Sequence, residues 1–110
     1  MQLKMEDYHK VAENEFIKYG KSMVFGTLTP ENISHIIQVG ASVMMTRDNF
    51  LQGGSFVQAV VNNDLQGAVN RADAVIRTSL VFMVYLNSNV RAELEIENMK
   101  SPSFETIEDR

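Results

Sequence analysis

The stretch GGSFVQAVVNNDLQGAVNRAD, residues 53–73, contains the clearest helix start and stop positions in this chain. A Gly-Gly-Ser turn precedes an apolar run, and Ser55 is placed to cap a helix over residues 56–62. Two asparagines then break the pattern, and Asp64 is placed to cap a second helix over residues 65–71. The stretch therefore predicts two short helices that meet at a polar corner.

Helical patterns also occur on the N-terminal side of this stretch. Residues 4–20 place apolar side chains three and four positions apart, which is typical of an amphipathic helix. Thr29 followed by Pro30 predicts the start of another helix, because threonine caps well and proline suits the first helical position. Gly40 lies on the apolar stripe of that helix, so we expect a second helix to approach closely there.

On the C-terminal side, Asp73 is placed to cap a helix over residues 74–88. This helix contains LVFMVYL, an apolar run that fits either a central core helix or an oligomer contact. A strand is the alternative for residues 80–86, because Val, Phe and Tyr favour strands, but the helical sequence before it favours a helix. Residues 91–98 are compatible with a helix or with an edge strand.

These patterns predict an all-α fold of four to five short helices in a compact bundle. Residues 1–98 form the predicted single helical domain, and residues 99–110 form a flexible acidic tail with few apolar residues. A chain of 110 residues buries only a modest core. Burial of the apolar segment 80–86 between copies would add to that core, so a homo-oligomer is expected.

Charge and composition exclude several classes of function. Residues 1–92 hold eight basic and eight acidic residues, whereas residues 93–110 hold two basic and six acidic ones. A neutral body with an acidic tail argues against wrapping by nucleic acid, which requires a basic face. No apolar run approaches the roughly 20 residues of a membrane span, and no secretory signal pattern is visible. The absence of cysteine fits a reducing compartment, so a cytoplasmic protein is expected.

The sequence contains no recognisable catalytic or metal-binding arrangement. His9 and His35 are isolated histidines, and neither has a metal-ligand partner at helical spacing. None of the serines lies in a Gly-x-Ser-x-Gly elbow, and the acidic residues show no spacing typical of a catalytic pair. We therefore expect a protein that is not an enzyme and that uses neither a cofactor nor a metal.

The turn at Gly53, Gly54 and Ser55 is a candidate anion site. Backbone N–H groups at a helix start have no partner within the helix, so those of Ser55 and the next two residues can bind a phosphate. Phe56 is a candidate to stack on a base, as is Tyr85. The alternative is a structural loop in which the glycines permit the turn and Ser55 caps the helix.

The polar residues that follow are candidates for the rest of the site. Asn62 and Asn63 can contact a base or ribose, and Arg71 with Asp73 can hold a phosphate-bearing ligand. The alternatives are a corner in which asparagine adopts the left-handed conformation, and a local ion pair of Arg71 with Asp64 or Asp73. The predicted ligand-binding residues are Gly53, Gly54, Ser55, Phe56, Asn62, Asn63, Asp64, Arg71 and Asp73.

The order Gly54-Ser55-Phe56, then Ala59-Val60, then Asn63-Asp64-Leu65, then Arg71-Ala72-Asp73 resembles a family of small proteins from tailed bacteriophages. The likeness covers about 35 residues in the middle of the chain, with Tyr85 in the following helix as a further match. The family has no known function. It often carries an Ile-Pro turn before Gly-Ser, where this chain has Leu51-Gln52-Gly53.

The resemblance implies a phage protein that acts in the cytoplasm of a bacterial host. Small phage proteins include sponges that sequester the nucleotide signals of bacterial immunity, and such proteins require no catalytic residue. The leading hypothesis is a sponge for a cyclic oligonucleotide or a cyclic ADP-ribose isomer. The alternatives are a helical inhibitor that binds a host defence enzyme, and a structural or regulatory homo-oligomer without a small ligand.

Overall fold

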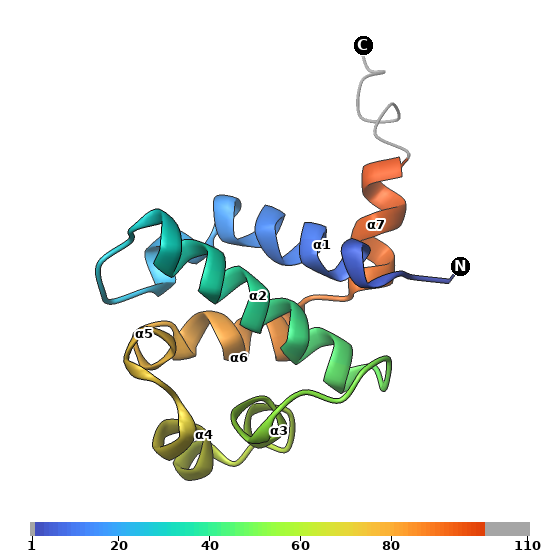
Figure 1. The fold of residues 1–110 in the computed structure, drawn as a ribbon. Coiled ribbons are helices and arrows are strands. Elements are labelled where there is room, and N and C mark those ends of the chain that lie inside the picture. The colour runs from blue at the N-terminus through green and yellow to red at the C-terminus, as the bar shows by residue number, and fades with distance from the viewer. Residues whose placement is uncertain (1, 101–110) are drawn as a thin grey trace.

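The computed structural model describes residues 2–100, and its regular structure within that range is entirely helical (Figure 1). The elements are α1 (Met5–Lys18), the 3₁₀ helix η1 (Gly20–Met23), α2 (Pro30–Arg47), α3 (Ser55–Val61), α4 (Leu65–Arg71), α5 (Ala74–Arg77), α6 (Leu80–Asn89) and α7 (Ala92–Lys100). The predicted all-α class is confirmed. The predicted number of four to five helices is wrong, because the described residues form seven α-helices.

Helix α2 is the central element of the fold. It packs against α1 on one side and against α3, α5 and α6 on others (Figure 1). The two short helices α3 and α4 pack against each other at one end of the molecule, and α7 packs against α1. The core therefore lies around α2, and α6 contributes the completely buried Phe82, Met83 and Leu86 to it.

Local sequence explains how α2 starts and how closely it packs. The hydroxyl of Thr29 accepts a hydrogen bond from the amide of Asn32 at 3.1 Å, and Pro30 is the first helical residue, as predicted. Gly40 faces α6, and a Cβ placed there would lie 2.6 Å from Cδ1 of Leu86. The expected close approach at Gly40 is thus confirmed, and α6 is the helix that makes it.

The predicted single helix over residues 74–88 is two helices, α5 and α6. The hydroxyls of Thr78 and Ser79 donate to the carbonyls of Val75 and Ile76, at 2.6 and 3.0 Å. The carbonyl of Thr78 accepts a hydrogen bond from the amide of Phe25 at 2.9 Å. This tertiary contact takes the carbonyl away from helix formation, and the local serine and threonine bonds stabilise the break.

The apolar segment in α6 is a helix, as favoured, but only part of it is buried. Phe82 and Leu86 are completely buried, whereas Val81 and Val84 are 49% and 47% exposed. Residues 92–98 are also helical, because they belong to α7, and Arg91 directly precedes that helix. The predicted acidic tail begins at residue 99, but α7 continues to Lys100, and residues 101–110 lie outside the described part of the chain.

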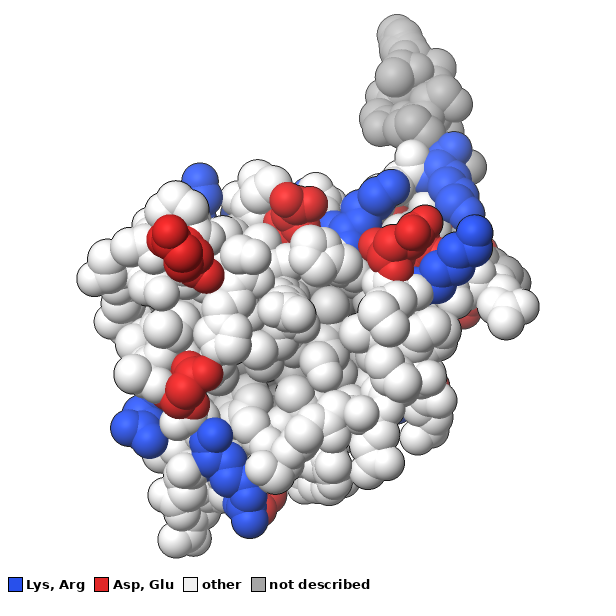
Figure 2. Space-filling view, in the orientation of Figure 1, with Lys and Arg blue, Asp and Glu red and all other residues white. Residues whose placement is uncertain are grey.

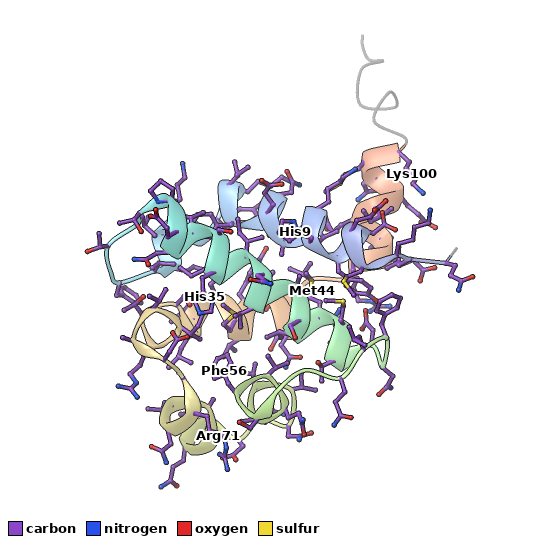
Figure 3. The ribbon with its side chains drawn as sticks, viewed as in Figure 1. His9, His35, Met44, Phe56, Arg71 and Lys100 are labelled. Atoms are coloured by element: carbon purple, nitrogen blue, oxygen red, sulfur yellow. The ribbon has the colours of Figure 1, made fainter. Side chains whose placement is uncertain are left out.

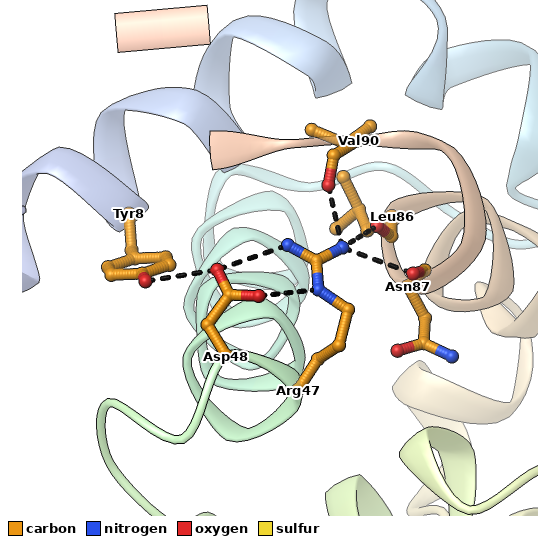
Figure 4. A network of polar contacts seen from close by, with 6 residues as sticks. All are labelled: Tyr8, Arg47, Asp48, Leu86, Asn87 and Val90. Carbon is orange, nitrogen blue, oxygen red and sulfur yellow. Dashed lines mark hydrogen bonds and ion pairs between the residues drawn. The ribbon is translucent and has the colours of Figure 1, made fainter. Parts of the chain in front are cut away.

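Arg47, the last residue of α2, ties that helix to the end of α6 (Figure 4). Its Nη1 donates to the carbonyls of Leu86, Asn87 and Val90 at 2.9, 3.1 and 2.6 Å. Its Nε donates to Asp48 at 2.8 Å. These bonds add a donor to three carbonyls at the end of α6, of which that of Leu86 also accepts from the amide of Val90 at 3.3 Å. The positive charge suits the negative end of the helix dipole.

Asp48 extends the same network to α1. The hydroxyl of Tyr8 donates to its carboxylate at 3.0 Å (Figure 4). Burial raises the pKa of Tyr8 to about 12, and the hydrogen bond to the negatively charged Asp48 acts in the same direction. The tyrosine therefore stays protonated at neutral pH and serves as a donor that joins α1 to the end of α2.

Candidate functional site

The turn before α3 has a different cap from the predicted one. Gly54 is the N-cap residue, and Ser55 is the first helical residue, with no capping bond from a side chain. The amide of Gly53 donates to the hydroxyl of Thr46 at 2.8 Å, so this donor is already used. The prediction that Ser55 caps the helix is therefore wrong, and Gly53 has no amide left for a ligand.

The two glycines of this turn have different surroundings. Neither has a positive φ angle, so the backbone conformation of the turn does not need glycine. At Gly53 a Cβ would lie 2.5 Å from the hydroxyl of Ser42, which explains glycine there by packing. At Gly54 a Cβ would have no neighbour within 4 Å, so that glycine leaves open space beside the start of α3.

At the corner between α3 and α4, Asn63 and Asp64 have the structural roles that were the alternative to binding a ligand. Asn63 has a φ angle of 61°, in the left-handed region that asparagine tolerates. Asp64 caps α4, as predicted, by accepting from the amide of Gly67 at 2.9 Å. Gly67 is buried, and a Cβ there would collide with the Asp64 carboxylate and lie 2.6 Å from Nη1 of Arg71. The missing side chain thus lets Asp64 and Arg71 lie over the same face of α4.

Asp73 caps α5, as predicted, and pairs with a residue that sequence reasoning did not connect to it. Its carboxylate accepts from the amide of Ile76 and lies 2.8 Å from Nε2 of His35 on α2. Burial alone would raise the pKa of Asp73, but the Ile76 amide and His35 favour the carboxylate and hold the pKa below its ordinary value. The contact joins α2 to the connection between α4 and α5.

Most of the predicted site residues surround two adjoining hollows beside α3. The first, of about 260 Å³, is named the apolar hollow because five of its lining residues are apolar. Its lining consists of Val39, Gly54, Ser55, Phe56, Val57, Arg71, Ala72, Asp73 and Ile76. The second, the polar hollow of about 220 Å³, is lined by Ser55, Gln58, Ala59, Asn62, Asp64 and Arg71. Figure 3 places Phe56 between α2 and α3 and Arg71 at α4.

Arg71 lines both hollows, and its guanidinium forms no direct bond in the described part of the chain. Its side chain is exposed, and it makes no hydrogen bond or ion pair with any of residues 2–100. The alternative of a local ion pair with Asp64 or Asp73 is therefore wrong. Both carboxylates lie nearby, but they cap helices, and Asp73 pairs with His35.

Two predicted residues lie away from these hollows. Gly53 lines neither of them, and Asn63 instead lines a groove between α4 and α6. Sequence reasoning missed the remaining lining residues, which are Val39, Val57, Gln58, Ala59, Ala72 and Ile76. All of these except Gln58 are apolar and have the spacing of ordinary core residues, so no pattern in the sequence distinguishes them.

Two larger hollows lie near the C-terminal end of α2, around Asn49 and Phe50, and one of them shares Gln58 and Asn62 with the polar hollow. Their volumes are about 440 and 530 Å³. The first contains the Arg47–Asp48 pair, whose polar atoms are already bonded to each other and to the end of α6. Arg91 and Glu93 add one charge of each sign to its lining. The charges of the first hollow are largely matched internally, and the second has no charged residue in its lining, so both offer less to a charged ligand.

The visible charged surface has no single dominant sign. Figure 2 shows basic and acidic side chains next to one another around the edge of one face, with an uncharged centre. None of the helices in residues 2–100 is long and apolar enough to cross a membrane. Within the same residues, no group of three or more acidic or histidine side chains is arranged to hold a metal ion.

Comparison with known proteins found no match to this chain among family models, curated proteins or solved structures.

Proposed function

We propose that this chain is a non-enzymatic phage protein that sequesters a nucleotide-derived immune signal in the cytoplasm of the bacterial host. The observation that carries the proposal is Arg71, an exposed guanidinium without a partner among residues 2–100, placed where two hollows meet. A guanidinium binds phosphate through paired hydrogen bonds, and one that is not already paired loses no partner when it does so.

The surrounding residues supply the other contacts that such a ligand needs. Ser55 lines both hollows, as Arg71 does, so its hydroxyl can bond the same phosphate. Phe56 gives the apolar hollow an aromatic wall against which a base can pack. Asn62 gives the polar hollow an amide that can bond a ribose or a base edge. The candidate ligands are cyclic oligonucleotides and cyclic ADP-ribose isomers.

A thermal-shift screen of the full chain against these compounds tests the proposal. A ligand that binds only the folded state stabilises it by about 2.7 kcal/mol at a hundredfold excess over Kd. For a domain of about 100 residues this raises Tm by roughly 10–20 °C. The proposal fails if none of the nucleotides shifts Tm at millimolar concentration and calorimetry detects no heat of binding.

Arg71→Ala is the variant that tests the residue itself. We expect a loss of affinity of about 1.5–3 kcal/mol with little change in Tm, because the side chain makes no bond to residues 2–100 in the free protein. Arg71→Lys should also lose affinity, since an ammonium cannot reproduce the planar fork. Arg91→Ala is the matched control, because it removes the same charge from a different hollow. Unchanged affinity in Arg71→Ala would remove Arg71 from the site.

A homo-oligomer forms the second part of the proposal. An apolar groove of about 210 Å³ between α4 and α6 is lined by Leu65, Leu80 and Val84, and Leu65 is 68% exposed. Asp64 is the only charged residue in its lining, so a second copy of the chain meets little like-charge repulsion there. Exposed apolar surface of this kind is typical of contacts between proteins.

Light scattering measures the proposed self-association directly. We expect a mass above the 12.4 kDa of one chain, and a return to that mass in Val84→Lys, which puts a charge into the groove. A constant mass of one chain at all concentrations would contradict it. The remaining alternatives are a helical inhibitor of a host defence enzyme and a structural or regulatory homo-oligomer without a small ligand. Removal of residues 100–110 separates the inhibitor from the sponge, because a sponge keeps its ligand without the tail.

A further inference from the structure

The two hollows at Arg71 have different walls, although they adjoin. The apolar hollow is bounded by side chains such as Val39, Phe56 and Ile76. The polar hollow is bounded by Gln58, Asn62 and Asp64. A ligand that fills both must therefore have a flat apolar part on one side and a hydroxyl- or amine-bearing part on the other. Its negative charge must lie between the two parts, at Arg71.

The charges around the hollows limit how much negative charge the ligand can carry. Arg71 is the one cation in the two linings, whereas Asp64 and Asp73 are both carboxylates. The charge of Asp73 is offset by its contact with His35 only when that histidine is protonated. A terminal phosphate with two or more charges would face an unfavourable balance here. A phosphodiester carries one negative charge that can pair with Arg71, and it meets less repulsion from Asp64 and Asp73 than a terminal phosphate does.

The volume of each hollow favours a ligand that is divided between the two. Volumes of about 260 and 220 Å³ are each below the range of roughly 300–1,000 Å³ that encloses a drug-sized ligand. One nucleoside would occupy one hollow and leave the other to water. Asn62 makes no side-chain hydrogen bond with any of residues 2–100, so both its donor and its acceptor are free for a second nucleoside.

We infer that the ligand is a phosphodiester that joins two nucleosides, with its phosphate at Arg71, one base in the apolar hollow and the second nucleoside in the polar hollow. The inference rests on the proposed function and narrows it. It favours dinucleotides over mononucleotides, nucleoside triphosphates and isomers of cyclic ADP-ribose, which carry a pyrophosphate and a single base.

Isothermal titration calorimetry with the full chain and four probes separates the requirement for a single negative charge from the requirement for two nucleosides. The dinucleoside monophosphate ApA carries one charge and two nucleosides, and cyclic AMP carries one charge and one nucleoside. AMP and ATP carry one nucleoside with more charge. We expect ApA to bind at least about tenfold more tightly than cyclic AMP, a difference of about 1.4 kcal/mol. Cyclic AMP should in turn bind more tightly than AMP, and ATP should bind most weakly.

Asn62→Ala tests the assignment of the second nucleoside. We expect it to lower the affinity for ApA severalfold and to leave the affinity for cyclic AMP unchanged, because only the second nucleoside reaches the polar hollow. Asn70→Ala is the control, since Asn70 is exposed on α4 and lines neither hollow. Tm measured on both variants shows that each remains folded.

The outcomes distinguish the inference from the function on which it rests. If cyclic AMP or ATP binds as tightly as ApA, or if Asn62→Ala weakens both probes equally, the two-nucleoside ligand is wrong and the nucleotide site remains. If none of the four probes binds but a cyclic ADP-ribose isomer does, the inference is overturned and the proposed function stands. If none of the four probes, no cyclic oligonucleotide and no cyclic ADP-ribose isomer binds, both the proposed function and the inference are overturned.

Discussion

Replacement of Arg47 by alanine should destabilise the protein far more than the same replacement of Arg71. The Arg47 side chain is 20% exposed and joins the end of α2 to the end of α6. Its Nη1 contacts three carbonyls, of Leu86, Asn87 and Val90, and its Nε contacts Asp48. Alanine would remove this donor from all four acceptors, of which Leu86 keeps the amide of Val90 and Asp48 keeps the hydroxyl of Tyr8. It would also remove a positive charge from the end of α6.

The size of the effect follows from this geometry. Nη1 carries only two hydrogens, so its three carbonyl contacts amount to about two full hydrogen bonds. Hydrogen bonds to charged groups contribute about 1.5–3 kcal/mol each, and water can reach part of this site after the exchange. We therefore expect a loss of about 2–4 kcal/mol, which lowers Tm by roughly 10–25 °C in a domain of about 100 residues.

Urea unfolding followed by circular dichroism measures this loss as a lower midpoint with an unchanged slope. Arg71→Ala is the internal control, because it removes the same side chain from a position without bonds to residues 2–100 and should change stability by less than about 0.5 kcal/mol. Arg47→Lys should lie between the two, since an ammonium keeps the charge but cannot span all four acceptors. Equal stability of Arg47→Ala and the parent chain would refute the reasoning.

Three further predictions concern single positions. Gly54→Asp should keep or slightly raise Tm, because aspartate is a good N-cap residue. It should weaken the binding of a phosphodiester about tenfold more than Gly54→Asn does, because asparagine caps equally well but adds no negative charge to the apolar hollow. Gly40→Ala should lower stability by about 1 kcal/mol despite the higher helix propensity of alanine, because its Cβ meets the completely buried Leu86; a gain in Tm would contradict this. The depressed pKa of Asp73 means that its carboxylate stabilises the fold above the unfolded pKa of about 3.9 and ceases to do so as pH falls through the lower folded value. Between about pH 7 and pH 3, thermal melts should therefore show a larger fall in Tm for the parent chain than for Asp73→Asn, in which asparagine still caps α5. An equal fall in Tm for the two proteins would exclude this stabilising role of the Asp73 carboxylate.

Local sequence predicted the helix starts that depend on a single short-range bond. Thr29, Asp64 and Asp73 each accept a hydrogen bond from the amide three residues later, as their residue types indicate. Ser55 did not follow this pattern. Gly54 takes the cap position, and the bond from the Gly53 amide to the Thr46 hydroxyl, which belongs to α2, holds the preceding turn.

The candidate site was predictable only in part. The sequence indicated Ser55, Phe56, Asn62 and Arg71, because glycine turns, amides and arginine are the usual components of a phosphate site. It could not indicate Val39 or Ile76, which are indistinguishable from core residues until the packing of α2 against α3 and α5 places them at a wall. It also offered no reason to pair His35 with Asp73, which are 38 residues apart.

What the sequence determined by itself is the all-α class and most helix starts, since periodicity and capping act over fewer than five residues. The tertiary structure decided where helices break and which groups remain free. Residues 74–88 divide into α5 and α6 because Thr78 bonds to Phe25, a residue more than fifty positions away. Arg71 has no partner among residues 2–100 because Asp64 and Asp73 are used as caps and Asp73 also contacts His35. Whether the guanidinium of Arg71 is unpaired depends on what each neighbouring group already binds, and only the folded chain determines which groups are its neighbours.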